Sequence, residues 1–269
     1  MSINQFFNFE RSFLKAKKSY GQHFLTNERI AERIADGLTL TDDVKYVVEV
    51  GPGKGMLTKY LLAKPTPLRV VEADRDMVEH LERHFPKLHG CIVADDILRV
   101  ELDVLTNGEP FALIGNFPYN ISSQILFKML DYRVQIPEMV GMFQREVAER
   151  VVAPAGSKTY GVISVLIQAY YEGKVLFGVE SGSFSPPPKV QSAVIRLVRR
   201  PEAALGCDAG LFSRIVKQTF QQRRKMLRNT MKFFLPEDPI LDDVFFNQRP
   251  EQLTVADFVK LTNWVSERK

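Results

Sequence analysis

The stretch Val48-Glu49-Val50-Gly51-Pro52-Gly53-Lys54-Gly55 decides the fold class, because it joins a short apolar run to a helical pattern. The run at residues 46–50 predicts a buried strand, and the residues near 55–63 predict a helix. A glycine-rich turn between them lets a ligand approach the backbone closely. A dinucleotide fingerprint needs its third glycine at position 56, where this chain has Met56, and Pro52 lacks an N–H for a pyrophosphate. The sequence of this turn therefore disfavours binding of a dinucleotide cofactor.

Short apolar strands alternate with helical patterns on both sides of this turn. We expect strands at residues 46–50, 68–73, 91–94, 111–115 and 138–143. We expect helices after an N-cap at Asn27 and near residues 55–63, 76–85 and 122–130. Runs that are apolar on both faces and separated by helices predict a parallel sheet with helices on each side. The expected fold class is therefore α/β, a doubly wound, Rossmann-like fold with a mostly parallel sheet.

The pattern changes in the second half of the chain. The expected elements there are a helix near 164–171, strands at 174–179 and 192–198, and helices at 211–221, 225–235 and 251–265. The two strands flank a proline-rich segment and can pair antiparallel. One proline and two glycines interrupt the pattern near residues 200–210, which is typical of a boundary. We therefore predict a first domain over residues 1–200 and a small, basic, all-helical domain over residues 201–269.

The basic residues are concentrated, although the net charge is only +4. Residues 1–25 carry +3 and residues 196–232 carry +8, so the rest of the chain is acidic. Two basic segments on an acidic body predict a polyanion that is held at particular places. A solvated helix face is the alternative interpretation of either segment.

Composition excludes several classes of protein. With 45% apolar and 25% charged residues, the chain is typical of globular proteins. No apolar run reaches the ~18 residues of a membrane helix, and the N-terminal residues do not resemble a secretory signal. Cys91 and Cys207 form neither a zinc pair nor a disulfide framework, which is typical of a reducing compartment. We expect a cytoplasmic protein with no membrane contact and no metal site.

Acidic residues follow the predicted strands at the edge where a ligand would bind. Glu72 lies 21 residues after Gly51, the offset of an acid that accepts hydrogen bonds from ribose hydroxyls. Asp96 follows the third strand and is placed to accept from an adenine amino group, with a surface position as the alternative. Together with Glu49, these acids suit an adenosine ligand that carries a cationic sulfonium and no phosphates. That ligand is S-adenosylmethionine.

The loop Asn116-Phe117-Pro118-Tyr119 follows the fourth predicted strand. The lone pair of an exocyclic amine is delocalised into its ring, so methylating it requires the nitrogen to be held in place. The Asn116 side-chain oxygen and the Pro118 carbonyl can accept the two N–H groups of the amine, and Tyr119 can stack on the base. Catalysis would then depend on positioning and desolvation more than on a strong base. A β-turn is the alternative interpretation.

These motifs, taken in order, resemble the ribosomal-RNA adenine dimethyltransferase family. The matching segments are Lys18–Leu25, Glu49–Gly55, Glu72, Asp96, Asn116–Tyr119, Phe184–Val190 and Gln222–Asn229. The resemblance implies an S-adenosylmethionine-dependent methyltransferase fold and cofactor contacts from His23, Leu25, Gly51, Gly53, Glu72, Asp96 and Asn116. Two positions differ from the usual sequence motif of the family: Phe117 stands where leucine is frequent, and His23 stands where asparagine is frequent. Phe117 affects only the shape of the pocket, and His23 receives no catalytic role.

The resemblance also implies residues that contact RNA. Phe184, which precedes three prolines, is expected to stack on the target base opposite Tyr119. A structural aromatic and a proline-rich partner motif are the alternatives. Phosphate contacts are expected from Arg223, Arg224, Lys225 and Arg228. The target adenine must leave its stack to be methylated, which is easier in an RNA loop than in a duplex.

The resemblance is strongest to the small-subunit branch of the family. It implies methylation of N6 of two adjacent adenosines near the 3′ end of small-subunit (16S) rRNA during ribosome biogenesis, by a monomer that acts on a pre-ribosomal 30S particle. One alternative is a large-subunit rRNA adenine methyltransferase of the antibiotic-resistance type. Another is an RNA-binding assembly factor whose methylation is incidental or lost.

Overall fold

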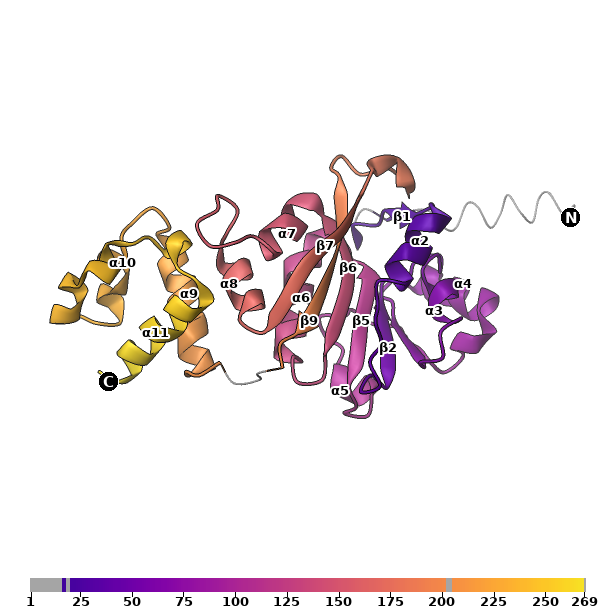
Figure 1. Cartoon of the computed structure of the whole chain (residues 1–269). Helices are drawn as coiled ribbons and strands as arrows, with labels where there is room; N and C mark the ends of the chain where they lie inside the picture. The colour runs from indigo at the N-terminus through magenta and orange to yellow at the C-terminus, as the bar shows by residue number, and fades with distance from the viewer. Residues whose placement is uncertain (1–15, 18–19, 202–204, 269) are drawn as a thin grey trace, which may run out of the picture. The chain divides into compact units, whose positions relative to one another are not determined.

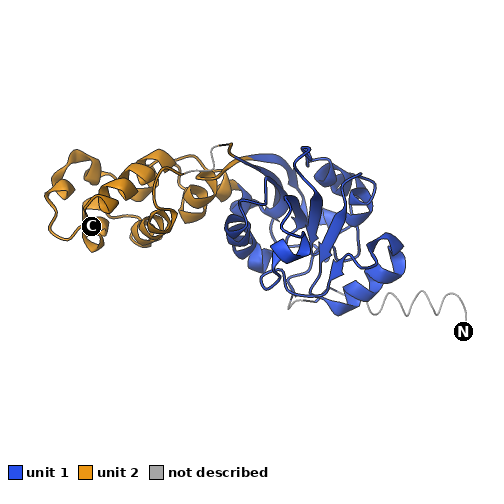
Figure 2. Ribbon diagram, turned by 90° about the horizontal axis from the view of Figure 1, so that it is seen from below, with its two compact units in different colours: residues 1–148, 174–199 blue, residues 149–173, 200–269 orange. Residues whose placement is uncertain are grey.

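The computed structural model describes residues 16–17, 20–201 and 205–268. Most of the basic N-terminal segment identified from the sequence lies outside these residues. The chain divides into two compact units, shown in different colours in Figure 2. Unit 1 contains residues 1–148 and 174–199, and unit 2 contains residues 149–173 and 200–269.

Unit 1 is built on a mixed sheet. Within the described residues the sheet has seven strands in the order β4-β3-β2-β5-β6-β9-β7 (Figure 1). Their bounds are β2 Tyr46–Val50, β3 Leu68–Val71, β4 Ile92–Val93, β5 Phe111–Asn116, β6 Glu138–Gln144, β7 Tyr171–Val179 and β9 Ser192–Arg199. Strands β2 to β6 run parallel, and β9 pairs antiparallel with β6. The predicted doubly wound, mostly parallel sheet is therefore confirmed.

Most helices of unit 1 lie between consecutive parallel strands, with one before β2 and one after β6. They are α2 Glu28–Ala35, α3 Thr58–Leu61, α4 Arg75–His84, α5 Leu102–Leu105 and α6 Ser122–Asp131, followed by α7 Arg145–Val151, which ends in unit 2. The predicted N-cap is confirmed, since the Asn27 side chain accepts from the N–H of Ile30. Helix α3 is shorter than predicted because the glycine turn extends into its first residues.

Three features of unit 1 were not anticipated from the sequence. A two-stranded sheet pairs β1 Phe24–Leu25 with β8 Phe184–Ser185, two segments far apart in the chain. Strand β7 begins at the buried residue Tyr171, where the sequence pattern predicted the end of a helix. Helix α7 was not predicted. No helix in the described part of the chain is long and apolar enough to cross a membrane.

Unit 2 is helical. Its main elements are α8 Val162–Gln168, α9 Ala209–Gln221, α10 Leu227–Thr230 and α11 Val255–Ser266. The predicted helix over 225–235 is divided between α10 and a 3₁₀ turn at Met231–Phe233, and α11 starts at the capping box of Thr254 and Asp257. Residues 149–173 group with these helices, because α8 packs on α9. The sequence pattern places them in the first domain instead.

Phe117 is a core residue beneath the loop that follows β5. Its side chain is 1% exposed and packs on Phe143, with ring centroids 5.0 Å apart. A Cβ added at Gly141 would lie 2.2 Å from the Phe117 ring. The glycine on β6 therefore makes the room that the larger aromatic side chain needs.

Gly141→Ala is expected to destabilise unit 1 by about 1–3 kcal/mol, because an added methyl group overpacks the core. In a Phe117→Leu background the same change should cost less, because the shorter side chain leaves room for the methyl. Thermal unfolding midpoints measure both effects. Gly178→Ala is the matched control, since nothing lies within 4 Å of a Cβ built at this β7 position. Equal penalties in the two backgrounds would contradict this packing.

Candidate functional site

A cleft of about 520 Å³ opens in unit 1 at the carboxyl ends of β2, β3 and β5. This edge is where parallel α/β sheets bind ligands, and the volume suits a small molecule. All seven residues that the sequence assigned to the cofactor line it, namely His23, Leu25, Gly51, Gly53, Glu72, Asp96 and Asn116. Pro118 and Tyr119 line it as well. The structure thus brings these predicted residues together.

The glycine turn forms the floor of this cleft. Gly51, Gly53 and Gly55 all have positive φ angles, of 64°, 55° and 80°. L side chains rarely adopt this conformation, so the turn requires glycine. A Cβ at Gly55 would also lie 2.4 Å from the Phe85 ring. The turn brings the backbone of Gly51 and Gly53 to the cleft, which Pro52 and Lys54 of the same turn also line.

Glu72 is held by backbone donors at the cleft wall. It is 6% exposed, its Oε2 accepts from the N–H of Gly53 at 3.1 Å, and its Oε1 accepts from the N–H of Asp74 at 2.9 Å. Burial raises the pKa of Glu72, and these N–H groups counteract the rise because they favour the charged form. A carboxylate oxygen has more than one acceptor site, so the fixed group can still accept from two neighbouring hydroxyls.

Asp96 lines the cleft from the loop that follows β4. Its Oδ1 accepts from the N–H of Leu98 at 3.0 Å, which orients the carboxylate. Neighbouring Asp95 is exposed, and its Oδ1 accepts from the N–H of Asp96 at 2.7 Å. Asp96 is the more buried of the two acids, in agreement with the sequence-based choice of this residue.

Glu49 differs from both acids in having an unsatisfied oxygen. It is 1% exposed, and within the described residues its Oε2 has no hydrogen-bond partner. Burial raises the pKa of Glu49 to about 8, and the nearby Glu72 carboxylate adds to the rise. Glu49 is therefore mostly protonated at neutral pH in the ligand-free chain, in a cleft where a cation would favour its ionised form.

The orientation of the Asn116 side chain is fixed by a backbone carbonyl. At the end of β5, its Nδ2 donates to the carbonyl oxygen of His23 at 3.0 Å. A carbonyl can only accept, so the amide must present its NH₂ end to His23. The opposite end, Oδ1, is left as a hydrogen-bond acceptor. This is the acceptor that the sequence analysis required.

The Pro118 carbonyl is a less available acceptor than predicted. It accepts from the N–H of Ile121 at 3.2 Å and lies 3.1 Å from the hydroxyl of Ser122. The Ser122 hydroxyl has one proton and lies equally close to the carbonyl of Tyr119, at 3.1 Å. When that proton points to Tyr119, one acceptor site of Pro118 is left for a ligand. The sequence did not predict this contact of Ser122, because a serine at the start of a helix is common and does not indicate a functional role.

Tyr119 lies against the N-terminal segment. Its ring stacks on that of His23, with centroids 5.5 Å apart and planes 28° from parallel. Its hydroxyl hydrogen-bonds the Ser192 side chain on β9, and burial raises its pKa, so the phenol stays neutral. No local sequence signal points to Ser192, since its pairing with Tyr119 is long-range. Tyr119 is thus fixed at the cleft with an aromatic neighbour.

Phe184 is not brought to the cleft. Its side chain is 4% exposed and belongs to the hydrophobic core cluster of unit 1. Its backbone pairs with Leu25 in the two-stranded sheet. In this structure the ring is covered by packing and is not available to a base, so the prediction of stacking opposite Tyr119 is not supported. The alternative interpretation, in which Phe184 is a structural aromatic residue, fits this packing better.

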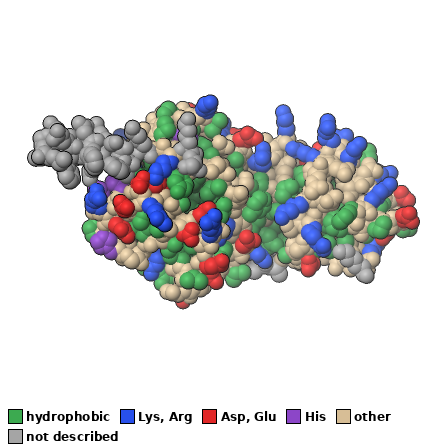
Figure 3. Space-filling view, turned by 180° about the vertical axis from the view of Figure 1, so that it is seen from behind, with side chains coloured by type: hydrophobic (Ala, Val, Ile, Leu, Met, Phe, Trp, Pro, Cys, Tyr) green, Lys and Arg blue, Asp and Glu red, His purple; other side chains and the backbone are tan. Residues whose placement is uncertain are grey.

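The four basic residues assigned to RNA differ in their surroundings within unit 2. Arg223 is half-buried and donates to the carbonyls of Ser157 and Lys158, and Arg228 donates to the Asn247 side chain. Arg224 and Lys225 are exposed, and their side chains form no hydrogen bond or ion pair with the described residues. Figure 3 shows Lys and Arg side chains spread over this part of the molecule. The structure therefore separates two engaged residues from two that face solvent.

Comparisons with known proteins show the family to which this chain belongs. The family described as ribosomal RNA adenine dimethylase matches residues 13–267. Ribosomal RNA small subunit methyltransferase A of Phocaeicola vulgatus is 52% identical over 253 residues, which cover 94% of this chain and 90% of that protein. The protein of the same description from Flavobacterium johnsoniae is 51% identical, and the match covers 93% of this chain and 95% of that protein.

Solved structures with the same fold include a dimethyladenosine transferase from Plasmodium falciparum, with a TM-score of 0.77, 23% identity and coverage of 91% and 98% of the two chains. The 23S rRNA methyltransferase ErmE has a TM-score of 0.67, 26% identity and coverage of 89% and 99%. Because the family match spans nearly the whole chain and the identity to relatives exceeds half, this chain belongs to the ribosomal RNA adenine dimethylase family.

Proposed function

We propose that this chain transfers methyl groups to N6 of two adjacent adenosines near the 3′ end of small-subunit rRNA, giving N6,N6-dimethyladenosine. The observation that carries the proposal is the Asn116 amide, whose oxygen is turned to accept an amine N–H because His23 holds the other end. Relatives described as small subunit methyltransferases, more than 50% identical over nearly the full length, support the choice of RNA. We extend the proposal to a cytoplasmic monomer that acts on an assembling small subunit.

The residues of the cleft fit the methyl donor of the family, S-adenosylmethionine. Glu72 offers a fixed pair of acceptor oxygens for the ribose hydroxyls, and Asp96 an acceptor for the adenine amino group. The glycine turn leaves room at the backbone, and Glu49 can balance a positive charge. When bound, this cofactor supplies a methyl group on a cationic sulfur. The chain's own residues must place the acceptor nitrogen in line with that methyl group.

The target amine would be oriented by acceptors rather than activated by a base. Asn116 Oδ1 accepts one N–H and the remaining acceptor site of the Pro118 carbonyl takes the second, which leaves the nitrogen lone pair directed at the methyl group. Tyr119 holds the plane of the base. Positioning of this kind and exclusion of water are the main rate-enhancing effects available, and the proton leaves after the nitrogen is alkylated. The adenine must first be turned out of its RNA stack.

A large-subunit adenosine is the second candidate substrate. The likeness to the 23S rRNA methyltransferase ErmE supports it, at 26% identity. The small-subunit relatives are about twice as similar in sequence and match over a similar share of the chain, so they carry more weight. A purely structural role in assembly is disfavoured by the intact, oriented Asn116 amide, although binding to an assembling particle is part of the proposal.

Mapping the methylated nucleotides after incubation with unmodified small and large subunits separates the two substrates.

Asn116→Ala is expected to lower single-turnover methylation by about 10²-fold or more, because the variant lacks the acceptor that orients the amine. Affinity for S-adenosylhomocysteine, measured by calorimetry, and affinity for RNA should change much less. Gln124→Ala, which removes an exposed carboxamide on α6 outside the cleft, is a control for the change itself. Methylation at the wild-type rate would reject the proposed role of Asn116.

Arg224→Gln combined with Lys225→Gln is expected to weaken RNA binding and to reduce its salt dependence. For each phosphate that the variant no longer neutralises, the slope of log affinity against log salt should fall by ~0.9 for duplex or ~0.7 for single-stranded RNA. Arg223→Gln is the matched comparison, because its side chain is engaged by Ser157 and Lys158 and should affect stability more than the slope. An unchanged slope in the double variant would show that these two residues do not bind phosphates.

Stability should fall as pH rises through the range set by Glu49. Its pKa in the folded chain is about 8 against an ordinary 4.5, so between these values the folded state holds a proton that the unfolded state releases. The contribution of Glu49 to stability therefore decreases as pH rises from about 4.5 to about 8.

Glu49→Gln should remove most of this slope and raise the unfolding midpoint at pH 8 more than at pH 5. Because a cationic ligand favours the ionised form, the variant should also bind S-adenosylmethionine more weakly. Unfolding midpoints and calorimetry across this pH range test both statements. Parallel stability profiles for the variant and the wild type would contradict a buried, protonated Glu49.

A further inference from the structure

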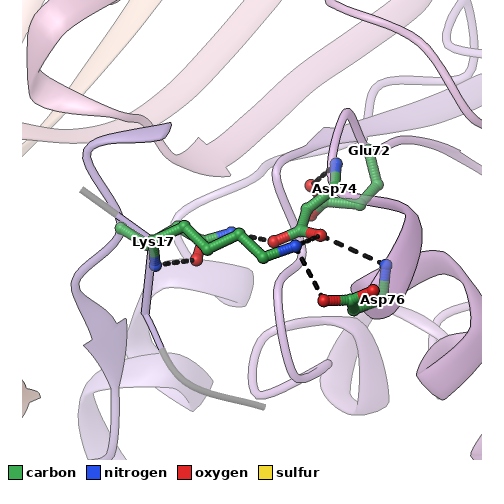
Figure 4. A network of polar contacts seen from close by, with 5 residues as sticks. Lys17, Glu72, Asp74 and Asp76 are labelled. Carbon is green, nitrogen blue, oxygen red and sulfur yellow. Dashed lines mark hydrogen bonds and ion pairs between the residues drawn. The ribbon is translucent and has the colours of Figure 1, made fainter. Parts of the chain in front are cut away.

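The N-terminal strap, defined as Lys17 together with residues 20–25, is tied at one end to the loop after β3. Lys17 Nζ lies 2.6 Å from Asp74 Oδ1 and 2.7 Å from Asp76 Oδ2 (Figure 4). The backbone N–H of Lys17 donates to Gln22 Oε1 at 2.8 Å, and Gln22 Nε2 donates to Asp74 Oδ2 at 3.0 Å. The strap therefore contacts both carboxylate oxygens of Asp74.

Asp74 connects this end of the strap to the acid that would hold the ribose. Its N–H donates to Glu72 Oε1 at 2.9 Å, and its own Oδ1 accepts from the N–H of Asp76 at the start of α4. Its side chain is 1% exposed. A buried carboxylate is costly without a compensating cation, and within the described residues Lys17 is the cation that pairs with it.

The other end of the strap touches the loop that would hold the amine. The carbonyl of His23 accepts from Asn116 Nδ2, and the His23 ring stacks on Tyr119. Between the two ends, the Phe24 ring lies 3.0 Å from where a Cβ would stand on Gly53. The strap thus crosses the cleft from the Glu72 loop to the Asn116 loop. Residues 20–25 all line the cleft.

Lys17 remains charged over the whole physiological range. Hydrogen bonds to Asp74 and Asp76 raise its pKa above the ordinary value. Its side chain is 39% exposed, but Asp74 is 1% exposed, so removing Lys17 leaves a buried carboxylate without its cation and is expected to cost stability. A role in stability alone predicts full turnover in variant protein that is still folded, whereas a role in placing the strap predicts a loss of turnover in the folded variant.

We propose that Lys17 and Asp74 are positioning residues for methyl transfer, which fix the strap so that the His23 carbonyl orients the Asn116 amide. The proposal rests on the proposed function, because it assumes that Asn116 contacts the target amine. Neither residue touches the reacting atoms. Both act through the strap, and Asp74 acts in addition through the N–H that holds Glu72.

The test compares four variants of the full chain. Lys17→Met removes the charge at nearly the same side-chain length, and Lys17→Arg keeps the charge. Asp74→Asn removes the negative charge but keeps an oxygen that can accept the N–H at the start of α4. The fourth variant combines Lys17→Met with Asp74→Asn. Lys64→Met is the matched control, since it breaks another lysine–aspartate ion pair of unit 1, with Asp36, whose members do not line the cleft. Single-turnover methylation is measured at saturating cofactor and RNA, together with S-adenosylhomocysteine affinity and the unfolding midpoint.

Lys17→Met and Asp74→Asn are each expected to lower the saturated rate by between about tenfold and about 10²-fold, the range expected for small displacements of a reacting group. The combined variant should be no slower than the slower single variant, because both changes break the same ion pair. Lys17→Arg should stay within about threefold of the wild type, and Lys64→Met should match it. Unfolding midpoints should fall for Lys17→Met, which leaves the buried Asp74 carboxylate without its cation, but should stay well above the assay temperature.

The proposal is overturned if Lys17→Met keeps its saturated rate within twofold of the wild type, or if Lys17→Arg is as slow as Lys17→Met. It is also overturned if the rate is lost only under conditions in which the variant is partly unfolded. Rates are compared on whichever ribosomal RNA the wild type methylates. If the wild type does not methylate small-subunit RNA, the proposed substrate is wrong. If Lys17→Met keeps the wild-type rate, the positioning role is wrong, so the two failures can be told apart.

Discussion

The hydrogen bond from Asn116 Nδ2 to the His23 carbonyl is the interaction on which the site depends. The two ends of a carboxamide are similar in size but opposite in hydrogen-bonding character, so an amide that turned over would present donors to an amine that is itself a donor. The carbonyl of His23 excludes that orientation. In the mechanism that we propose, positioning supplies most of the rate enhancement, so one backbone carbonyl outside the Asn116 loop would control whether the loop can work.

The charged residues of the two units suit the two ligands of the proposed reaction. The acids Glu49, Glu72 and Asp96 line the cleft of unit 1 and are the proposed partners of a cationic adenosine compound. Lys54, Arg75 and Arg99 line the same cleft, so it also has cations for an RNA whose adenine enters it. In unit 2, Arg224 and Lys225 are exposed cations, which we propose to bind phosphates.

Local patterns in the sequence were sufficient for the parallel strands, for the Asn27 cap and for placing Gly51, Glu72 and Asp96 around one cleft. Strand periodicity and the offset between Gly51 and Glu72 are short-range properties, and parallel pairing then brings strand ends to one edge. Long-range pairing was not predictable in the same way. Phe184 is buried because its strand pairs with a segment near the start of the chain, and the hydroxyl of Tyr119 pairs with Ser192, 73 residues away. Arg223 is engaged by a segment that the sequence pattern assigns to the other domain.

The most direct test of this account is a crystal structure of the chain with S-adenosylhomocysteine and an RNA fragment that carries the target adenosine. The account predicts Asn116 Oδ1 within about 3.2 Å of the adenine N6, with Nδ2 still donating to the His23 carbonyl. An adenine bound in the cleft with its N6 facing away from residue 116, or an Asn116 amide that has left His23, would contradict it.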